Sequence, residues 1–279
     1  MKIEFYTDSR KDKNEDIYGV TKYGAFVLDG ASSLINTSFT PEGNDVHWMV
    51  NWWKSYLEVE LDLLDQGIED ILQRGIRNFN KEYGKYTNVE RLSCLEQISA
   101  GIALVRRRGN SLECFVLGDV EITIQNRDGE VEIITDNSLK YLDSEVIDMV
   151  SSGPDRESRI VFKGFTNEEL QILKTNRMKM NKIGGYNILA CSVDAIKNGI
   201  YRKYPIKKIK RCLLSTDGIN PLDKYYSREN LLDEMDKRGV KGLISELRDI
   251  ETNDKDMKKI KRLKTHDDAT AVLLNFILT

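Results

Sequence analysis

Acidic residues stand at four separate places in this chain where an apolar run begins or ends. These places are Asn14-Glu15-Asp16, Asp29-Gly30, Asp217-Gly218 and Asp267-Asp268. Because a β-sheet gathers the ends of strands that are far apart in sequence, carboxylates at strand ends can meet in one place. Carboxylate and carbonyl oxygens are the ligands that hard cations such as Mg²⁺ or Mn²⁺ prefer. The pattern therefore predicts a site for Mg²⁺ or Mn²⁺.

Each of these acidic pairs also has an ordinary interpretation. An Asp-Gly pair by itself is a weak signal, because it is the commonest dipeptide in tight turns. Asp128-Gly129, between two alternating strand-like stretches, is predicted to be such a turn. Asp29-Gly30 and Asp217-Gly218 differ, because each follows an apolar run with no strand directly after, and glycine lets a backbone carbonyl approach a cation. Plain turns at these two pairs, a solvated loop at residues 14–16 and a capped turn at residues 267–268 are the alternatives.

The elements that must position these residues can be predicted from hydrophobic periodicity. Apolar residues at three- and four-residue spacing predict two amphipathic helices, over residues 46–64 and 68–83. Apolar runs bounded by turn residues predict strands at residues 2–6, 17–20, 25–28, 100–106, 112–117, 121–124, 131–134, 186–192, 209–215 and 270–278. Residues 136–185 have weak strand signals and a helical bias, and polar helices are expected over residues 222–263.

Strands that cluster apart from helices and are joined by hairpins predict an α+β fold. A chain of 279 residues can hold one large core or two small ones. The apolar strands at both ends favour a single domain over residues 1–279, in which residues 136–185 form a flap or insert.

The composition argues against several classes of protein. The formal net charge of −3 gives no overall attraction to nucleic acid or anionic membranes. The chain has no secretory leader pattern and no run of ~18 apolar residues. Its four cysteines form no Cys-x-x-Cys pair and are expected to be free thiols in a cytoplasmic protein. It also lacks a Cys-x5-Arg loop, a Gly-x-Ser-x-Gly elbow and a Walker-type glycine loop.

Over nearly the whole chain, the order of motifs resembles that of the metal-dependent serine/threonine phosphatases of type 2C. The motifs are Lys11-Asp-Lys-Asn-Glu-Asp16, Val27-Leu-Asp-Gly30, Ser99-Ala-Gly-Ile-Ala103, Leu117-Gly-Asp119, Leu214-Ser-Thr-Asp-Gly218 and Asp267-Asp-Ala-Thr270. No motif is specific alone, but six of them in the family's order are fairly specific. The related bacterial sporulation and stress-response phosphatases also end in an Asp-Asp-x-Thr motif.

The resemblance implies two antiparallel sheets packed as a sandwich with helices on both outer faces, and a two-metal site at one end. It implies that Asp29 bridges both ions, that Gly30 offers its carbonyl, that Asp217 and Asp267 hold one ion, and that Glu15 and Asp16 hold the other. Asp119 matches an aspartate that the family uses for a third ion. Asp268 stands where the family usually has asparagine, and is expected to support the ligands.

Three positions depart from the family pattern. The family's phosphate-binding arginine maps to Lys11, with Arg10 one place earlier. Lysine attracts phosphate as a point charge, whereas arginine can form two parallel hydrogen bonds with it. Ala31 replaces the histidine that often follows Asp-Gly, and Val120 replaces the usual serine. Of the two histidines, His266 beside the aspartate pair could assist a leaving group, whereas His47 is expected to be structural.

The resemblance implies hydrolysis of phosphoserine or phosphothreonine in proteins, by direct attack of water held between two metal ions. Asp29, Lys11 and Arg10 would form the catalytic set. Phosphoproteins, among them a cognate kinase or its targets, are the expected partners; nucleic acid and membranes are not. A catalytically weak or inactive phosphatase-like module that binds a partner is the alternative, motivated by Lys11 and Ala31. A small phosphate ester as substrate also stays open.

Overall fold

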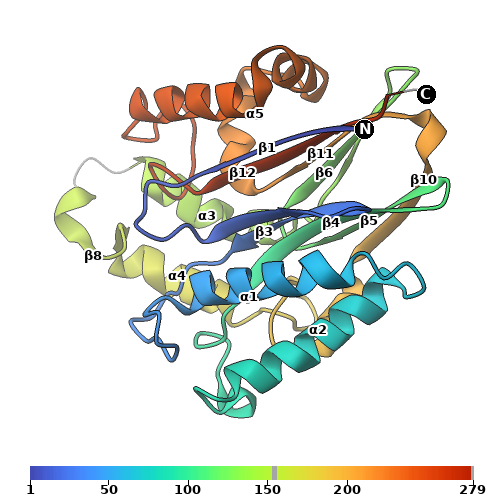
Figure 1. Ribbon diagram of the computed structural model, residues 1–279. Coiled ribbons are helices and arrows are strands. Elements are labelled where there is room, and N and C mark those ends of the chain that lie inside the picture. Colours follow the sequence, from blue (N-terminus) through green and yellow to red (C-terminus); the bar gives the residue numbers. More distant parts are fainter. Residues whose placement is uncertain (153–155, 278–279) are drawn as a thin grey trace.

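Two five-stranded antiparallel sheets face each other in the computed structural model, which describes residues 1–152 and 156–277. The first sheet has the order β1 (Lys2–Asp8), β12 (Ala269–Asn275), β11 (Ile209–Ser215), β6 (Glu121–Asn126) and β7 (Val131–Ile134). The second has the order β10 (Ile200–Pro205), β5 (Ser111–Leu117), β4 (Ala100–Arg108), β3 (Gly24–Gly30) and β2 (Asp16–Val20). Both termini of the described chain lie on the first sheet side (Figure 1).

Helices cover the outer face of each sheet (Figure 1). Within the described residues, the α-helices are α1 (Asp45–Glu60), α2 (Ile68–Tyr83), α3 (Ser138–Ser152), α4 (Asn167–Arg177) and α5 (Arg228–Thr252). Short 3-10 helices occur at η1 (Val89–Arg91), η2 (Glu157–Arg159), η3 (Val193–Asn198), η4 (Ile206–Lys208) and η5 (Asp217–Lys224). With α1 and α2 outside the second sheet and α5 outside the first, the layers are αββα, and the predicted fold class is confirmed.

The central strands are apolar on both faces because both faces are covered. In β3, Val27 joins the core between the sheets, whereas its neighbours Phe26 and Leu28 face the core shared with α1 and α2. Leu214 of β11 likewise faces the inter-sheet core, and Leu213 packs under α5. Successive side chains of a strand point to opposite faces, so one strand supplies two cores.

The first two predicted helices are confirmed as α1 and α2. Asn44 caps α1, because its side chain accepts a hydrogen bond from the His47 amide at 3.0 Å. Trp53 of α1 is fully buried against α2, where a Cβ on Gly75 would lie 2.5 Å from its ring. The close contact of the two helices therefore depends on that glycine.

The segment from residue 136 to residue 185 carries α3, α4 and the small hairpin of β8 (Ile160–Phe162) and β9 (Phe165–Thr166). Lys163 and Gly164 form the hairpin turn with positive φ values of 46° and 88°, which is the pattern of a type I′ turn. The predicted helical bias of this segment is met by α3 and α4, and its strands are very short. Val146, Phe165 and Leu173 form a small apolar cluster of their own.

Three sequence expectations were wrong in detail. Residues 186–192, all of them described, form isolated bridges rather than a strand, as at the pairing of Ala100 with Leu189. Strand β10 was not predicted, because it is an edge strand whose side chains are largely exposed and polar. Helix α5 ends at Thr252, and a loop replaces the helix expected up to residue 263. Residue 278 of the last predicted strand lies outside the described residues.

Across the described ranges, no helix combines the length and the apolar character needed to span a membrane.

Replacing Trp53 with alanine should lower the free energy of unfolding by about 3–5 kcal/mol, because a large buried side chain leaves a cavity between α1 and α2. Urea denaturation measures this loss. The control is Val59→Ala on the same helix, where the side chain is 66% exposed and little should change. Equal losses in both variants would contradict the packing described for α1.

Candidate functional site

The two sheets bring their acidic strand ends together at one end of the sandwich. Asp16 at the start of β2 is paired in register with Asp29 near the end of β3. The Thr216 hydroxyl, just after β11 in the other sheet, donates to Asp16 Oδ2 at 2.6 Å. The amide of Asp217 donates to Asp29 Oδ2 at 3.4 Å. Asp29 and Asp217 therefore meet here although they lie 188 positions apart in the sequence.

Two glycines permit the close approach of the backbones at this junction. A Cβ on Gly30 would lie 2.5 Å from the Glu15 carbonyl oxygen, to which the Gly30 amide donates at 3.0 Å. A Cβ on Gly218 would lie 1.9 Å from the Asp268 carbonyl oxygen. Glycine after each aspartate is thus required by neighbouring backbone, in addition to the access to a cation expected from the sequence.

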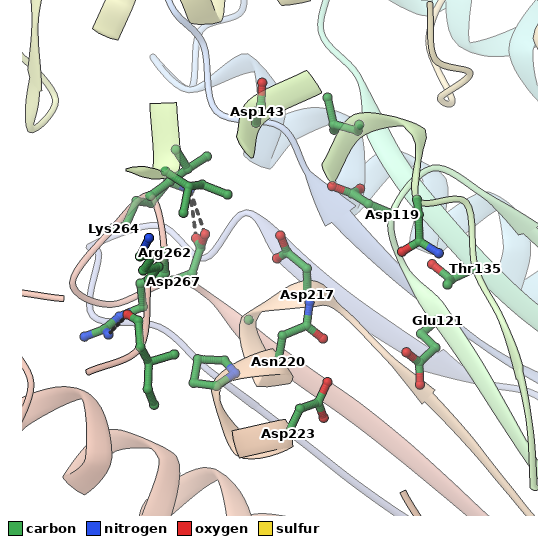
Figure 2. A pocket seen from close by; sticks show the side chains of 18 of the residues that line it. Asp119, Glu121, Thr135, Asp143, Asp217, Asn220, Asp223, Arg262, Lys264 and Asp267 are labelled. Atoms are coloured by element: carbon green, nitrogen blue, oxygen red, sulfur yellow. Dashed lines mark hydrogen bonds and ion pairs between the residues drawn. The ribbon is translucent and has the colours of Figure 1, made fainter. Parts of the chain in front are cut away.

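The strand-end aspartates line connected hollows. A hollow of about 340 Å³, hereafter the acidic hollow, is lined by Asp119, Asp143, Asp217, Lys264 and Asp267 among others, and Figure 2 shows several of these side chains facing it. An adjoining hollow of about 130 Å³ is lined by Asp29, Gly30, Asp119, Asp217 and Asp267. Of the predicted metal ligands, these five therefore share one site.

The carboxyl groups of this site cannot all ionise without a balancing charge. Burial raises the pKa of Asp29 well above its usual range, and Asp16 and Asp217 raise it further. Burial also raises the pKa of Asp16, with contributions from Asp268 and Asp267. The pKa of Asp217 rises to about 6 and that of Asp119 to about 7, again through burial first and neighbouring carboxylates next. Such crowding disfavours the ionised forms.

The chemistry of this donor set fits a hard divalent cation, which takes oxygen ligands and offsets clustered negative charge. The geometry is not that of a finished cage, because no group of three or more His, Cys, Asp or Glu side chains in the described ranges is arranged to hold an ion. Side chains must therefore adjust when an ion binds. The fit lies in the kind and number of oxygens rather than in their present positions.

Two lysines neutralise part of the cluster. Lys264 Nζ donates to both carboxylate oxygens of Asp267, at 2.8 Å and 3.0 Å (Figure 2). Lys11 Nζ donates to Glu15 Oε2 at 2.8 Å and to Asp268 Oδ2 at 2.9 Å. Burial acts to lower the pKa of each lysine, but the surrounding carboxylates outweigh it, so both pKa values are raised and both groups stay charged.

Glu15 lies beside Lys11 and is held by several hydrogen bonds. Its carboxylate also accepts from the Ser32 hydroxyl and from Asn44 Nδ2, the latter at 3.1 Å. Burial would raise the pKa of Glu15, but Lys11 and these hydrogen bonds lower it overall. Asp268 accepts from the Ser9 hydroxyl at 2.5 Å and from the Glu15 amide at 3.0 Å. It thereby ties the loop before β12 to the loop before β2.

A second large hollow, hereafter the lysine hollow, adjoins the site. It has a volume of about 470 Å³ and is lined by Lys11, Lys13, Lys163 and Lys264, together with Glu15, Ser32, Ser33 and Asn44 among others. Lys163 comes from the turn of the β8–β9 hairpin and donates to the Ser33 carbonyl at 3.2 Å. Its pKa is lowered by burial and by the nearby ammonium groups of Lys11 and Lys264, although Glu15 opposes this. Closely spaced cations of this kind favour an anion.

The structure does not bring Arg10 to the carboxylates. Arg10 lines a separate hollow of about 230 Å³ with Asp8 and Arg248. His266 is not among the residues that line the acidic hollow; its Nδ1 lies 2.9 Å from Glu251 Oε2, and Glu251 in turn accepts from Arg248 Nη1 at 2.7 Å. These contacts hold the residue before Asp267. His47 pairs with Glu42 near the start of α1, at 3.0 Å.

Sequence reasoning missed Asp143, Lys163 and Lys264. Asp143 and Lys163 belong to the segment in which no motif was found, so no local signal singled them out. Lys264 had one usable signal, because it precedes Asp267 by three residues and can fold back on it within one turn. The neighbouring run of lysines made it resemble a solvated surface residue instead.

The sequence matches the family model described as Protein phosphatase 2C over residues 9–246. No curated protein matches it significantly. Among solved structures, the Mycobacterium tuberculosis serine/threonine phosphatase PstP/Ppp has a TM-score of 0.57 at 16% identity, with 99% of each chain covered. The Staphylococcus aureus serine/threonine phosphatase Stp1 has a TM-score of 0.55 at 16% identity, covering 100% of this chain and 95% of that chain. The catalytic domain of PstP in complex with two manganese ions has a TM-score of 0.52 at 15% identity, covering 98% and 97%. At these identities the likeness concerns the fold.

Protein kept free of metal with EDTA should become less stable as pH rises from about 4 to about 7. Asp119 and Asp217, with pKa values of about 7 and about 6, hold protons in the folded state at pH values where unfolded aspartates, with a pKa near about 3.9, have lost them. The folded state binds more protons in this window, so raising the pH favours unfolding. Melting temperatures across the window measure the effect.

The double variant Asp119→Asn, Asp217→Asn is the comparison, because it keeps the shape of both side chains and removes both titrations. Its melting temperature should depend less on pH than that of the unchanged protein. An identical pH dependence in the two proteins would contradict the shifted pKa values.

Proposed function

The chain belongs to the protein phosphatase 2C family, and from that premise we propose that it is a metal-dependent phosphatase of phosphoserine or phosphothreonine in proteins. The observation that carries the proposal is the convergence of Asp29, Asp119, Asp217 and Asp267, from both sheets, on one partly buried site. The raised pKa values of Asp29, Asp119 and Asp217 support this proposal, because a divalent cation would offset the crowded negative charge there.

In this proposal the ions are Mg²⁺ or Mn²⁺, and the two manganese ions in the PstP catalytic domain support that choice. Asp217 and Asp267 would hold one ion, Asp29 would be shared by both ions, and Gly30 would offer its carbonyl. Asp16 and Glu15 would hold the second ion, directly or through water, and Asp119 a third. When bound, such ions supply an activated water and offset charge on the phosphoryl group.

The chain's own residues would bind and orient the phosphate. The lysine hollow lies beside the carboxylates and presents the ammonium groups of Lys11 and Lys163. Lys11 is the better supported of the two candidates predicted at the arginine position, because Arg10 lines a different hollow. Part of the charge of Lys11 is already matched by Glu15 and Asp268, so its attraction for phosphate would be weaker than that of an arginine fork.

We also propose that the chain is one phosphatase domain in which the segment around residues 136–185 acts as a flap. The segment supplies Lys163 to the lysine hollow and Asp143 to the acidic hollow. A phosphoprotein substrate, such as a kinase or its target, would contact this segment first. The four cysteines of the chain are free thiols, which supports the proposal of a reducing cytoplasmic setting.

A second candidate function is a catalytically weak or inactive module that binds a partner through the same surface. It is favoured by one observation: Lys11 and Lys264 already occupy carboxylate oxygens that the ions would need. Turnover separates the two candidates, because the binding module would hydrolyse no phosphate ester even with Mn²⁺ saturating.

The protein should hydrolyse p-nitrophenyl phosphate in the presence of Mn²⁺, and EDTA should abolish the reaction. Asp29→Asn and Asp217→Asn should each lower kcat by about 100-fold or more, since even residues that only support metal ligands contribute about 10–100-fold. Asp128→Asn is the matched control, because its Asp-Gly pair lies in the turn between β6 and β7. Activity that survives EDTA or both site substitutions would rule the proposal out.

Lys11→Met should raise KM for the same substrate by about 10- to 100-fold at saturating Mn²⁺, because it removes a charged hydrogen-bond donor from the lysine hollow. Arg10→Met is the matched control and should leave KM nearly unchanged, since Arg10 faces another hollow. The opposite ranking of these two variants would transfer the phosphate-binding role to Arg10.

A further inference from the structure

We propose that Lys264 is a tethered cation that competes with divalent ions for the carboxylate cluster, and so lowers the affinity of the site for metal. This inference rests on the proposed function, because it concerns the same site. It adds a residue that the family motifs do not contain and that the sequence alone did not single out.

The first observation is the geometry of the ion pair. Lys264 Nζ lies 2.8 Å and 3.0 Å from the two oxygens of Asp267, so one ammonium group engages the whole carboxylate. A divalent ion bound by Asp267 needs lone pairs of the same oxygens at about 2.0–2.6 Å. Two cations that share one carboxylate at these distances repel each other, so the ion must displace the ammonium group or bind weakly.

The second observation is that the influence of Lys264 extends beyond Asp267. Lys264 lines the acidic hollow together with Asp217, and it lines the adjoining hollow together with Asp29 and Asp217, so its ammonium group is near both carboxylates. These are the residues proposed to hold the first ion. Lys264 therefore supplies inside the protein part of the positive charge that the ions would bring.

The third observation is that Lys264 has room to leave. It lines both the acidic hollow and the lysine hollow, so its side chain stands at the boundary between them. Lysine has a flexible four-carbon stem, and rotation of that stem can move its charge without moving the backbone. An ion arriving at Asp267 can thus displace the ammonium group into the lysine hollow, where the Glu15 carboxylate is also present.

Two other roles for Lys264 account less well for these contacts. As a proton donor it would be poor, because its ammonium group is held in an ion pair with Asp267. The ion pair with Asp267 by itself stabilises the fold only modestly, because the side chains of Lys264 and Asp267 are 30% and 32% exposed. Competition with metal uses both the position and the charge of the residue.

The test is isothermal titration calorimetry of the full chain with MnCl₂. Lys264→Met should bind Mn²⁺ about 10- to 100-fold more tightly than the unchanged protein, the range expected for loss of a competing charged hydrogen bond. Lys264→Arg keeps the charge and should bind like the unchanged protein. Lys258→Met removes a lysine from an exposed pair with Asp256 in the same loop and should also change nothing.

Melting temperatures provide a second measurement that does not depend on activity. In EDTA, Lys264→Met should melt below the unchanged protein, because the carboxylates lose their internal counter-ion. Added Mn²⁺ should raise its melting temperature by more than it raises that of the unchanged protein. A lower melting temperature that Mn²⁺ does not restore would show a purely structural role and overturn the inference.

Failure of this inference is distinguishable from failure of the proposed function. If the unchanged protein binds Mn²⁺ and Asp217→Asn does not, while Lys264→Met binds no more tightly, the metal site stands and the competing role of Lys264 is refuted. If neither the unchanged protein nor Lys264→Met binds Mn²⁺, both proposals are refuted. Should Lys264→Met fail to fold, Lys264→Gln carries the same predictions.

Discussion

Like charges confined at the meeting point of two sheets are the constraint on which the rest of the site depends. Asp16 and Asp29 are brought together by the pairing of β2 with β3, and Asp217 follows β11 in the facing sheet, so their proximity is set by the backbone. Removing water from carboxylates makes their ionisation costly unless cations or hydrogen-bond donors stand nearby. Thr216 supplies a hydrogen-bond donor, Lys11 and Lys264 supply positive charge, and the proposed ions would supply more.

The fold could be predicted largely from the sequence because the cores leave a clear pattern in it. Leu213 and Leu214 are both apolar because β11 is covered on both faces. The apolar residues from Val46 to Leu57 follow a helical spacing because α1 is covered on one face only. Strand β10 left no such pattern, because an edge strand exposes most of its side chains. Residues 186–192 misled for the opposite reason: Ile188 and Leu189 are buried, but by loop packing rather than by a sheet ladder.

The site was predictable to the extent that its residues lie at strand ends. The positions of Asp29 and Asp217 follow from the register of long strands, which a sequence can reveal. Strand register could not decide between Arg10 and Lys11, because both follow the end of β1. Arg10 lines a hollow with Asp8 and Arg248, whereas Lys11 lines the lysine hollow. Lys264 and Lys163 lie in loops, whose course is set by tertiary contacts with distant segments.

The loop between α5 and β12 is joined to the segment that carries α3. Met257 packs in the cluster formed by Val146 and Phe165, and Lys261 pairs with Asp148 at 2.7 Å. The same loop carries Lys264 and leads directly into Asp267. The loop that carries Lys264 and Asp267 is therefore in direct contact with the segment proposed as a flap.

The contact between Gly218 and the Asp268 carbonyl has a consequence for how this protein can be altered. Because a Cβ on Gly218 would lie only 1.9 Å from the Asp268 carbonyl oxygen, the segment after β11 and the segment before β12 must have matching backbone conformations. Chimeras that exchange one of these segments with a homologue while keeping the other would mismatch backbone against backbone. Chimeras should therefore fold only when both segments come from the same parent, although Gly218 and Asp268 lie 50 positions apart in the chain.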